Sequence, residues 1–545
     1  MYECPNCGSN LKFDIAAQQM LCSHCSTAVD PYSIQKEHDA EESNEYDVTV
    51  FRCTQCGAEL LSEDTTAATF CSFCGSTAVL DSRIGKGRRP AHIIPFLKTK
   101  EDCKAAYASM MRRAVFAPKE LKDQEYIEKF RGIYMPYWVY SFEKKGQITF
   151  QGSESRQRGD YLVTKHYDIT SRVDASYEGI SFDAAASFSD DLSGAIAPYD
   201  MAAGKRFTPA FLSGFYADAG DVDSSVYKQD ARDMAAEDGF ARIAGDRECS
   251  RYHVKDTGNA VSLKNALAPE CTSAESAMFP VWFLSYRKGD RVAYAVVNGQ
   301  TGKAAADLPV DRKKYLIGSL LLAIPLFVLL NIRFTITPGL ALMLSALLAL
   351  VCAFVSASQM TGIQEKETRE NDKGYVFLQQ ERKDWGHRGG EFGESGVQER
   401  RAYSRNRRNI ITLIQVLTAA AIFMFFMPLA MALVIFRGGD KMGIIAVLII
   451  CAGLIGIVCS KRWLEPGRKG SLKKMIPVLV KPVAAIVLAL AIILWNPVSD
   501  LFYYGGSIVS MGAVIWTLMD IIGRYNVLTT RKLPQLNRRG GDENG

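Results

Sequence analysis

Apolar and polar positions divide the chain into two unequal parts. The mean hydropathy is near zero, at −0.02, but roughly the last 230 residues alternate long apolar runs with basic clusters. Six runs of 18 or more residues cover 315–332, 338–357, 410–435, 442–460, 478–495 and 501–522. At 1.5 Å per residue, a helix of that length crosses a hydrocarbon core of about 30 Å. The pattern therefore predicts an all-α region of six transmembrane helices, two in 315–357 and four in 410–523.

Basic residues give these spans an orientation. Eleven lysines and arginines lie in the glycine-rich charged loop 358–409, six in 461–477 and five in the tail 524–545, whereas the opposite side carries three. Lysine and arginine are enriched in cytoplasmic loops, and no export signal begins the chain. We therefore expect a multi-pass protein of a bacterial cytoplasmic (inner) membrane with both termini cytoplasmic. We expect the 358–409 loop to be largely disordered, and its charges either set topology or bind anionic membrane lipids.

Residues 91–310 show mixed helical and strand patterns that predict an α+β cytosolic domain. A helix is predicted from Thr99, its N-cap, through Arg112 and Arg113, and another over 223–243. Two hairpins look related, because Pro136 and Trp138 recur as Pro280 and Trp282 at an offset of 144 residues. This repeat suggests a duplicated unit. The tryptophans are expected to fill the core, with ligand binding as the alternative.

The cysteines supply the strongest chemical pattern. Eight of the 14 lie in Cys-x-x-Cys pairs, in two sets of four with a fourteen-residue gap inside each set and a period of 49 residues. The sets are Cys4, Cys7, Cys22 and Cys25, and then Cys53, Cys56, Cys71 and Cys74. Two such pairs complete a tetrahedral four-thiolate site, with Gly8, Gly57 and Gly75 easing the turns. We predict two small zinc ribbons holding two structural Zn²⁺ ions, at residues 1–30 and 50–82.

Other uses of these cysteines are less consistent with the pattern. A thioredoxin-like redox pair would need a surrounding βαβ pattern, which is missing here. His24 could replace a cysteine ligand, but a solvent-facing position is the preferred interpretation. A closed four-thiolate site leaves no open position for water, so catalysis by these metals is not expected.

Charge argues against nucleic acid as a partner. Residues 1–80 carry twelve acidic and three basic side chains, a net charge of −9. Nucleic-acid affinity depends largely on neutralising phosphates with lysine and arginine. We therefore expect no nucleic-acid partner, and interpret the ribbons as structural or protein-docking modules joined by an acidic linker at 31–49. Residues 83–90, "RIGKGRRP", are interpreted as a basic hinge.

No catalytic motif is evident in the sequence. It contains six histidines but no H-E-x-x-H, G-x-S-x-G or Walker pattern. Asp190 and Asp191 could be paired carboxylates, although an exposed turn is preferred. The predicted spans show no ion path, because Lys481, Asp500 and Asp520 lie toward span ends. We predict a protein that is not an enzyme.

Several stretches together resemble a known group of proteins. "HIIPF", "GIYMPYWVY", "FLSGFYAD" (211–218) and "NGQTGK" (298–303), after a zinc ribbon and before membrane spans, resemble the bacterial TFIIB-type zinc ribbon-containing membrane proteins over roughly 50–335. The resemblance implies association with phage-shock A-type and SPFH-domain proteins in envelope maintenance. This chain differs by its second ribbon and its four additional spans after residue 409.

These observations favour a non-enzymatic membrane scaffold that recruits protein partners through the ribbons and the α+β domain. A transporter or lipid-handling protein with regulatory ribbons is the alternative. The oligomeric state is open.

Overall fold

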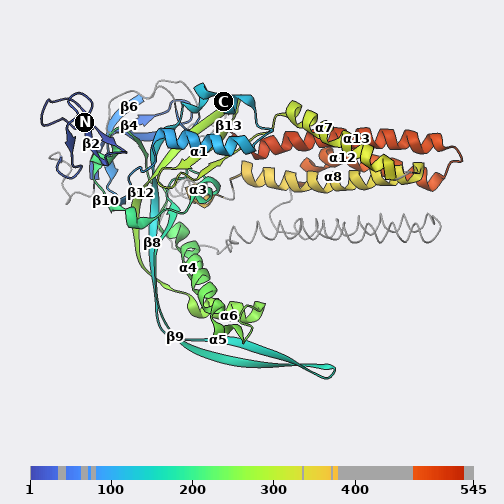
Figure 1. The fold of residues 1–545 in the computed structure, drawn as a ribbon, viewed down its shortest axis with the longest axis horizontal. Coiled ribbons are helices and arrows are strands. Elements are labelled where there is room, and N and C mark those ends of the chain that lie inside the picture. The colour runs from blue at the N-terminus through green and yellow to red at the C-terminus, as the bar shows by residue number, and fades with distance from the viewer. Residues whose placement is uncertain are drawn as a thin grey trace, which may run out of the picture.

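The computed structural model describes residues 2–34, 45–62, 71–74, 81–333, 337–369, 372–378 and 471–532. Its N-terminal part begins with a small antiparallel sheet of β1 (Leu11–Asp14), β2 (Gln19–Cys22) and β3 (Ala28–Val29). Alternate apolar residues of this sheet, Leu11, Phe13 and Met20, are buried against the central domain. The first ribbon is therefore packed on the domain and is not a separate module (Figure 1).

The second ribbon is continuous with the large sheet. Its strands are β4 (Glu45–Arg52), β5 (Glu59–Ser62) and β6 (Asp81–Arg88). β5 pairs antiparallel with β11 (Tyr216–Asp218), which belongs to the central domain. Two expectations change, because residues 45–49 of the predicted linker are in β4, and residues 83–88 of the predicted hinge are in β6. The hinge assignment is wrong, since backbone pairing with β4 holds these residues despite their two glycines.

The central domain contains seven further strands and six helices of varied length. They are β7 (His92–Ile93), α1 (Lys100–Arg113), α2 (Gln124–Ile127), β8 (Arg131–Arg158), β9 (Tyr161–Asp183), α3 (Asp190–Ile196), β10 (Lys205–Arg206), α4 (Ser225–Gly245), α5 (Arg247–Ser250), α6 (Thr257–Leu267), β12 (Glu270–Lys288), β13 (Arg291–Asn298) and β14 (Ala304–Ala306), with short 3-10 turns at Lys119–Lys122, Met201–Ala203 and Pro209–Leu212. Both predicted helices are present as α1 and α4. Thr99 caps α1 in a reciprocal capping box with Asp102, as the sequence pattern indicated.

The sheet confirms that the two hairpins are repeats. β8 and β12 pair antiparallel, and Met135 lies opposite Phe279, its own equivalent at the 144-residue offset. β7 pairs in parallel with β12 at Ala277, and β11 pairs in parallel with β8 at Ile133, which is again the same offset. Two β-α-β-β units are therefore related by a local two-fold axis. Their tryptophans are equivalent too, because Trp138 donates to the carbonyl of Val222 and Trp282 to that of Lys98.

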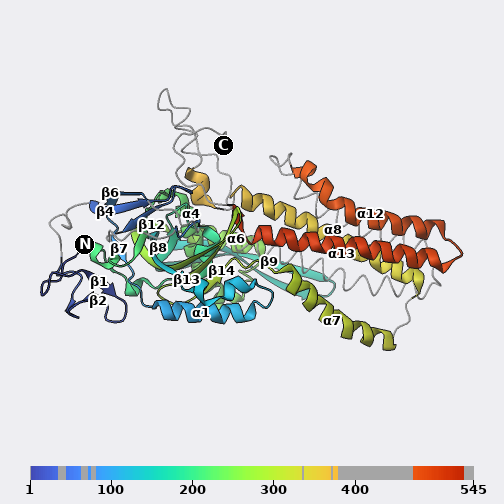
Figure 2. The same ribbon diagram turned by 90° about the horizontal axis from the view of Figure 1, so that it is seen from above.

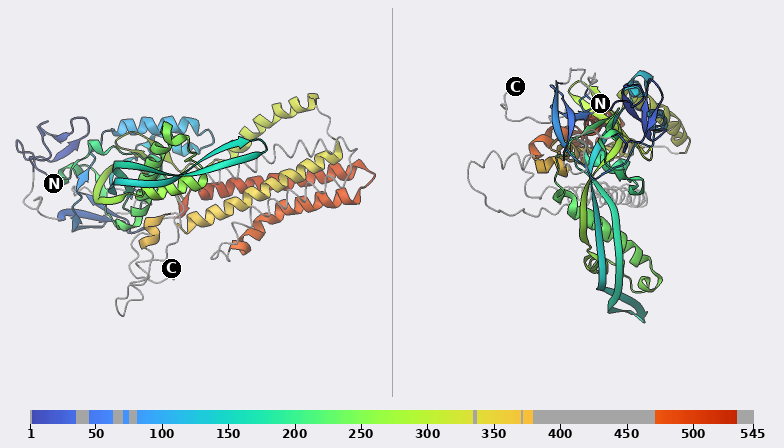
Figure 3. Two further views of the ribbon diagram at one scale, coloured as in Figure 1. Left: turned by 90° about the horizontal axis from the view of Figure 1, so that it is seen from below. Right: turned by 90° about the vertical axis from the view of Figure 1, so that its left-hand side faces the viewer.

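One hairpin is much longer than its repeat. β8 and β9 have 28 and 23 residues, whereas β12 and β13 have 19 and 8. The long hairpin leaves the sheet and passes α4, α5 and α6, against which Ile148 and Phe150 are buried (Figure 1). It then continues as a free two-stranded arm, which Figure 2 and Figure 3 show from other sides.

Four long helices extend from the end of the domain that lies away from the two ribbons (Figure 1). They are α7 (Arg312–Arg333), α8 (Pro338–Glu367), α12 (Ser471–Trp495) and α13 (Asp500–Leu528). α8, α12 and α13 pack through small side chains such as Ala346, Ala489 and Ala485, whereas α7 diverges from them (Figure 2). After α13 the chain returns to the sheet as β15 (Arg531–Lys532), paired with β13.

Within the described residues, three segments are long and apolar enough to cross a membrane. They are Pro338–Met360, Pro477–Trp495 and Asp500–Leu528, which suggests that the protein associates with a membrane. The prediction of six spans is not supported: 315–332 forms α7, which is not one of the three, and 410–435 and 442–460 lie outside the described residues. Part of the loop predicted to be disordered is folded, because α8 continues to Glu367 and Tyr375 packs against the core, and residues 379–409 lie outside the described residues.

A buried asparagine fixes the turn after β13. The Asn298 side chain is fully buried, accepts hydrogen bonds from the backbone of Gln300 (2.8 Å) and Thr301 (2.9 Å), and donates to the carbonyls of Ile196 (3.0 Å) and Pro198 (3.3 Å). Next to it, a Cβ on Gly299 would lie 2.6 Å from the Phe96 ring. The "NGQTGK" stretch is therefore a structural turn that packs β13 against the core.

We predict that Asn298→Ala destabilises the protein by about 2–3 kcal/mol, because it leaves buried backbone groups without partners. Thermal unfolding of the purified protein in detergent would measure the shift. Thr301→Ala is the matched control, since its hydroxyl only accepts from the Lys303 backbone at an exposed position. Equal melting temperatures for the two variants would refute this role of Asn298.

Candidate metal centres and their link to the helices

The eight predicted cysteines come together in two groups of four. In the first group the Sγ atoms of Cys4 and Cys25 are 3.5 Å apart, those of Cys7 and Cys22 are 3.5 Å apart, and those of Cys7 and Cys25 are 3.4 Å apart. In the second group the Cys53–Cys74 and Cys56–Cys71 separations are both 3.7 Å. Within each group all four sulfurs lie within 4.8 Å of one another. His24 is exposed and belongs to neither group.

These separations fit a tetrahedral metal site. Zinc–sulfur bonds of about 2.3 Å in a tetrahedron place sulfurs about 3.8 Å apart. A disulfide would need about 2.05 Å, and the eight cysteines are free thiols. Two such groups could each hold one metal ion, and four sulfur donors suit zinc.

The same backbone turn builds three of the four knuckles. The amide of Gly8 donates to the Cys4 carbonyl at 2.8 Å, that of Gly57 to the Cys53 carbonyl at 2.8 Å, and that of Ser26 to the Cys22 carbonyl at 3.0 Å. All three residues have positive φ, at 72°, 71° and 56°. Glycine takes that conformation without strain, which explains its place after two of the pairs. Gly75 lies outside the described residues.

The two groups differ in exposure. Cys7 is exposed and Cys25 is partly exposed, whereas all four cysteines of the second group are buried. A hydrogen bond with the Thr27 hydroxyl, 2.9 Å away, lowers the pKa of Cys25 to about 6. A side-chain hydrogen bond with Cys71 lowers the pKa of Cys53 to about 6. In the same groups, against the lowering effect of its backbone hydrogen bonds, burial raises the pKa of Cys22 to about 11, and hydrogen bonding with Cys53 raises the pKa of Cys71.

The first ribbon is attached to the domain near Phe211. The Phe13 ring packs edge-on against Phe211 with centroids 5.1 Å apart, and the Ser213 hydroxyl donates to the Leu11 carbonyl at 2.8 Å. Tyr32 also contacts Phe211 and donates to the Arg206 carbonyl at 2.9 Å. The "FLSGFYAD" stretch therefore forms the surface on which the first ribbon packs.

The second ribbon is attached to the short hairpin β12–β13. The buried Tyr294 hydroxyl donates to the carbonyl of Phe73, which lies between Cys71 and Cys74, at 2.8 Å. Burial raises the pKa of Tyr294, so this donor stays protonated at all ordinary pH values. Arg287 donates to Gln55, in the other knuckle, at 3.1 Å. Both knuckles of the second ribbon are therefore fixed to the sheet.

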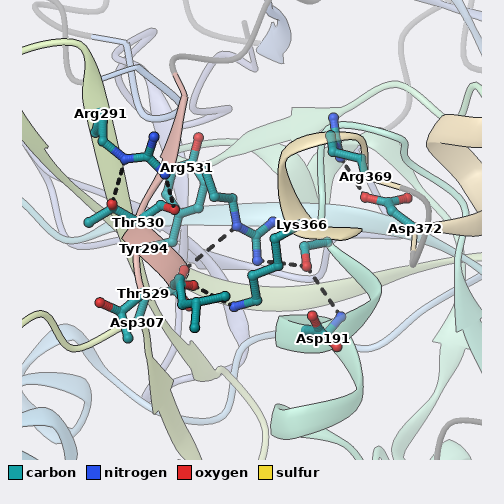
Figure 4. Close-up of polar contacts among 12 residues, drawn as sticks. Asp191, Arg291, Tyr294, Asp307, Lys366, Arg369, Asp372, Thr529, Thr530 and Arg531 are labelled. Atoms are coloured by element: carbon teal, nitrogen blue, oxygen red, sulfur yellow. Dashed lines mark hydrogen bonds and ion pairs between the residues drawn. The ribbon is translucent and has the colours of Figure 1, made fainter. Parts of the chain in front are cut away.

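Tyr294 also contacts the chain segment that follows α13. The Arg531 guanidinium lies 5.8 Å from the Tyr294 ring, donates to Ser189 at 2.8 Å, and approaches Asp307 at 3.7 Å. Burial raises the pKa of Asp307, and the charge of Arg531 opposes this shift. Figure 4 shows Tyr294, Asp307 and Arg531 close together at this junction between the domain and the helices.

Arg291 closes the end of α13 at the same junction. Its guanidinium donates to the carbonyls of Val527 (2.8 Å) and Thr530 (2.9 Å) and to the Thr530 hydroxyl (2.7 Å) (Figure 4). It also pairs with Glu367 at the end of α8, at 3.2 Å. Arginine satisfies the free carbonyls that every helix C-terminus leaves. One strand, β13, therefore carries both the contact to the second ribbon and the contact to the helices.

Buried carboxylates in this part of the domain were missed from the sequence. Asp190 is not in an exposed turn, because Ser189 caps α3 there and Asp190 accepts from Tyr227 at 2.7 Å. Asp183 is fully buried, and burial raises its pKa well above the usual range. Burial raises the pKa of Asp218, hydrogen-bonded to Ser187, to about 7. These acids form internal hydrogen bonds, and no spacing in the sequence distinguishes them from exposed ones.

Comparison with known proteins gives limited information. No protein-family model matches the chain, and no solved structure matches it. The chain is 27% identical over 319 residues to the "Uncharacterized protein YdjG" of Bacillus subtilis (strain 168), a match that covers 57% of this chain and 91% of that protein.

We predict that the protein binds two metal ions and that a chelator removes them at two rates. The exposed first group should lose its ion quickly, and the buried second group slowly. Elemental analysis and chelator-coupled absorbance would measure the content and the rates. Cys7→Ser should abolish the fast phase and Cys71→Ser the slow phase, each leaving about one ion. Release of both metal ions in a single phase would contradict the expectation that the buried group loses its ion more slowly.

We also predict that Tyr294→Phe speeds metal release from the second group roughly fivefold, because it removes one hydrogen bond worth about 1 kcal/mol from the knuckle. The fast phase should not change. Tyr107→Phe is the control, since that buried hydroxyl donates to the Leu121 carbonyl at 3.0 Å, away from both groups. An identical effect of the two variants would show that Tyr294 does not support the site.

Proposed function

We propose that this protein is a non-enzymatic membrane scaffold whose ribbons and α+β domain recruit protein partners at a bacterial inner membrane. The ribbons hold structural Zn²⁺. The proposed role is envelope or membrane-stress maintenance, and the proposed partners are phage-shock A-type or SPFH-domain proteins, as the family resemblance implies.

The observation that carries the proposal is the continuous attachment of both ribbons to the helices. Phe211 holds the first ribbon, Tyr294 the second, and Arg291 and Arg531 hold the domain to α8 and α13. A scaffold that holds its partners in a fixed position at a membrane needs such a rigid connection. A flexible linker would be sufficient if the ribbons only had to remain close to the membrane.

The non-enzymatic part of the proposal rests on the metal groups. Each has four sulfur donors, which fill a tetrahedral site and leave no position for water or substrate. The buried acids Asp183 and Asp218 form internal hydrogen bonds.

The proposed orientation places the domain and both termini on the cytoplasmic side. Three features on one side of the helices support it: the start of α7 at Arg312, the end of α8 at Glu367 and the strand β15 after α13 all adjoin the domain. The basic residues of 358–409 and 524–545 belong to that side under the positive-inside rule.

An ion pair between two apolar helices supports the alternative function of transport or lipid handling. Lys481 lies 2.6 Å from Asp520, and its ammonium group lies 4.1 Å from the Trp516 ring centre. Charged residues inside spans often mark substrate paths. However, Lys481 lies close to the start of the candidate span Pro477–Trp495 and Asp520 lies in the domain-side third of α13, where a structural role at the membrane boundary is sufficient.

The scaffold proposal is tested by purifying the full chain from detergent-solubilised membranes together with a phage-shock A-type or SPFH-domain protein of the same genome. We expect a complex whose yield falls at least tenfold with Cys4→Ser/Cys7→Ser or Cys71→Ser. Cys103→Ser, a buried cysteine outside both groups, is the control. Equal yields from all variants, or substrate flux in proteoliposomes without partner binding, would favour the alternative.

Nucleic acid gives a separate test. Because residues 1–80 carry a net charge of −9, we expect no retention of DNA or RNA by the purified protein even at low salt. Electrophoretic mobility shift would measure it. A shift that weakens steeply with salt would overturn this expectation.

A further inference from the structure

The free end of the long hairpin is an exposed arm that carries three consecutive apolar residues directly after its Gly159–Asp160 turn. All thirteen residues from 154 to 166, called the arm tip here, are exposed. Tyr161 is 76% exposed, Leu162 is 71% exposed and Val163 is 44% exposed. Three consecutive apolar residues at the end of a solvated two-stranded ribbon stabilise nothing within this fold, because the hydrogen bonds of the tip are internal to the hairpin.

The arrangement of the tip fits a membrane interface. Consecutive strand residues point to opposite faces, so Tyr161 and Val163 share one face and Leu162 is on the other. Each face therefore carries an apolar side chain next to a polar or basic one, the amphipathic composition that suits the boundary between lipid and water. Arg158 pairs across from Tyr161, and Arg156 pairs across from Val163. Tyrosine is enriched at the lipid headgroup level, and arginine binds the phosphates there.

The helices of the same chain determine where the bilayer must be. α13 has 29 residues and is about 44 Å long, so it exceeds a hydrocarbon core of about 30 Å. Asp520 lies about 30 Å along α13 from Asp500. The Lys481–Asp520 pair, with Arg524 donating to Ser356 at 2.8 Å, makes a polar layer at that depth. This layer marks the domain-side boundary of the hydrocarbon, and the last turns of α13 extend beyond it.

The arm points in the same direction as these helices. In Figure 1 it descends from the sheet away from the bundle and then turns to run in the same general direction as the bundle, well below it, with its tip beyond the domain-side ends of α8 and α13. Figure 3 shows the same direction from below. The tip is therefore displaced sideways from the bundle and lies level with the helices, beyond their domain-side ends (Figure 1).

We propose that the arm tip inserts into the lipid interface to one side of the bundle, with Tyr161, Leu162 and Val163 at the headgroup boundary and the long side chains of Arg156 and Arg158 extending from the same depth to the phosphates. The arm and the helices then hold the domain to the membrane at two separated points. This fixes the tilt of the domain and the direction in which the ribbons face. The inference depends on membrane embedding of the helices, but not on the identity of any protein partner.

A photo-crosslinking amino acid at Leu162 tests the proposal in full-length protein reconstituted into nanodiscs of phosphatidylethanolamine and phosphatidylglycerol. Mass spectrometry should find lipid adducts at Leu162 at least tenfold more often than at Arg172, an exposed position of the same strand beside the domain. Adducts to protein alone, whether to a second copy or to another chain, would overturn the proposal, as would equal lipid yields at the two positions.

Hydrogen exchange gives an independent measurement. In the nanodiscs the backbone amides of 158–166 should exchange several-fold more slowly than in Tyr161→Ser/Leu162→Ser/Val163→Ser, which should keep its full metal content. Equal exchange in the two proteins would also overturn the proposal. Failure of the chain to enter nanodiscs would instead refute membrane embedding of the helices. The scaffold proposal is tested separately, by whether the cysteine variants of the ribbons lose the complex with the partner protein.

Discussion

The cap that Arg291 places on α13 is the interaction on which the rest of the arrangement depends. A helix that leaves a membrane ends with free carbonyls, and here one guanidinium satisfies those of Val527 and Thr530. Because Arg291 begins β13, the cap also aligns β15 for pairing with that strand. Three residues further along β13, Tyr294 contacts the second ribbon. The position of the metal group relative to the helices is thus set within four residues of one strand.

Burial of charge at this junction has a cost that its hydrogen bonds must offset. Asp307 is almost fully buried, and Arg531 is its ionic partner at 3.7 Å. A buried ion pair of this kind adds little net stability, but loss of one partner is strongly unfavourable. Arg531 also donates to Ser189, the cap of α3. The network therefore favours one geometry between domain and helices more than it adds to stability, which is what a rigid connection requires.

Sequence patterns predicted the local features and missed the long-range ones. Cysteine spacing identified both groups of four, because the ligands are close in sequence, and the offset of 144 residues revealed the hairpin repeat. The junction was not predictable, since Arg291 and Thr530 are 239 residues apart and neither belongs to a motif. The "RIGKGRRP" stretch looked like a hinge by composition, and only its pairing with β4 makes it a strand. Likewise, nothing in the spacing of Asp190 and Asp191 indicated that one of them accepts a buried tyrosine hydroxyl.

The two repeats show how one fold element can acquire two roles. Both hairpins cross the local two-fold axis at equivalent residues, Met135 and Phe279, so the inner halves of the two hairpins occupy equivalent positions in the sheet. Their outer halves have diverged. The short hairpin ends at Gly289, and its strand β13 supports the ribbon and the helix cap. The long hairpin continues past the helices that pack on it, where its residues contact no core. The two-fold symmetry fixes where both hairpins begin in the sheet. The difference in strand length determines how far each hairpin extends from it. The duplication therefore places a helix-binding strand and a projecting arm on one sheet, at positions that neither unit could supply by itself.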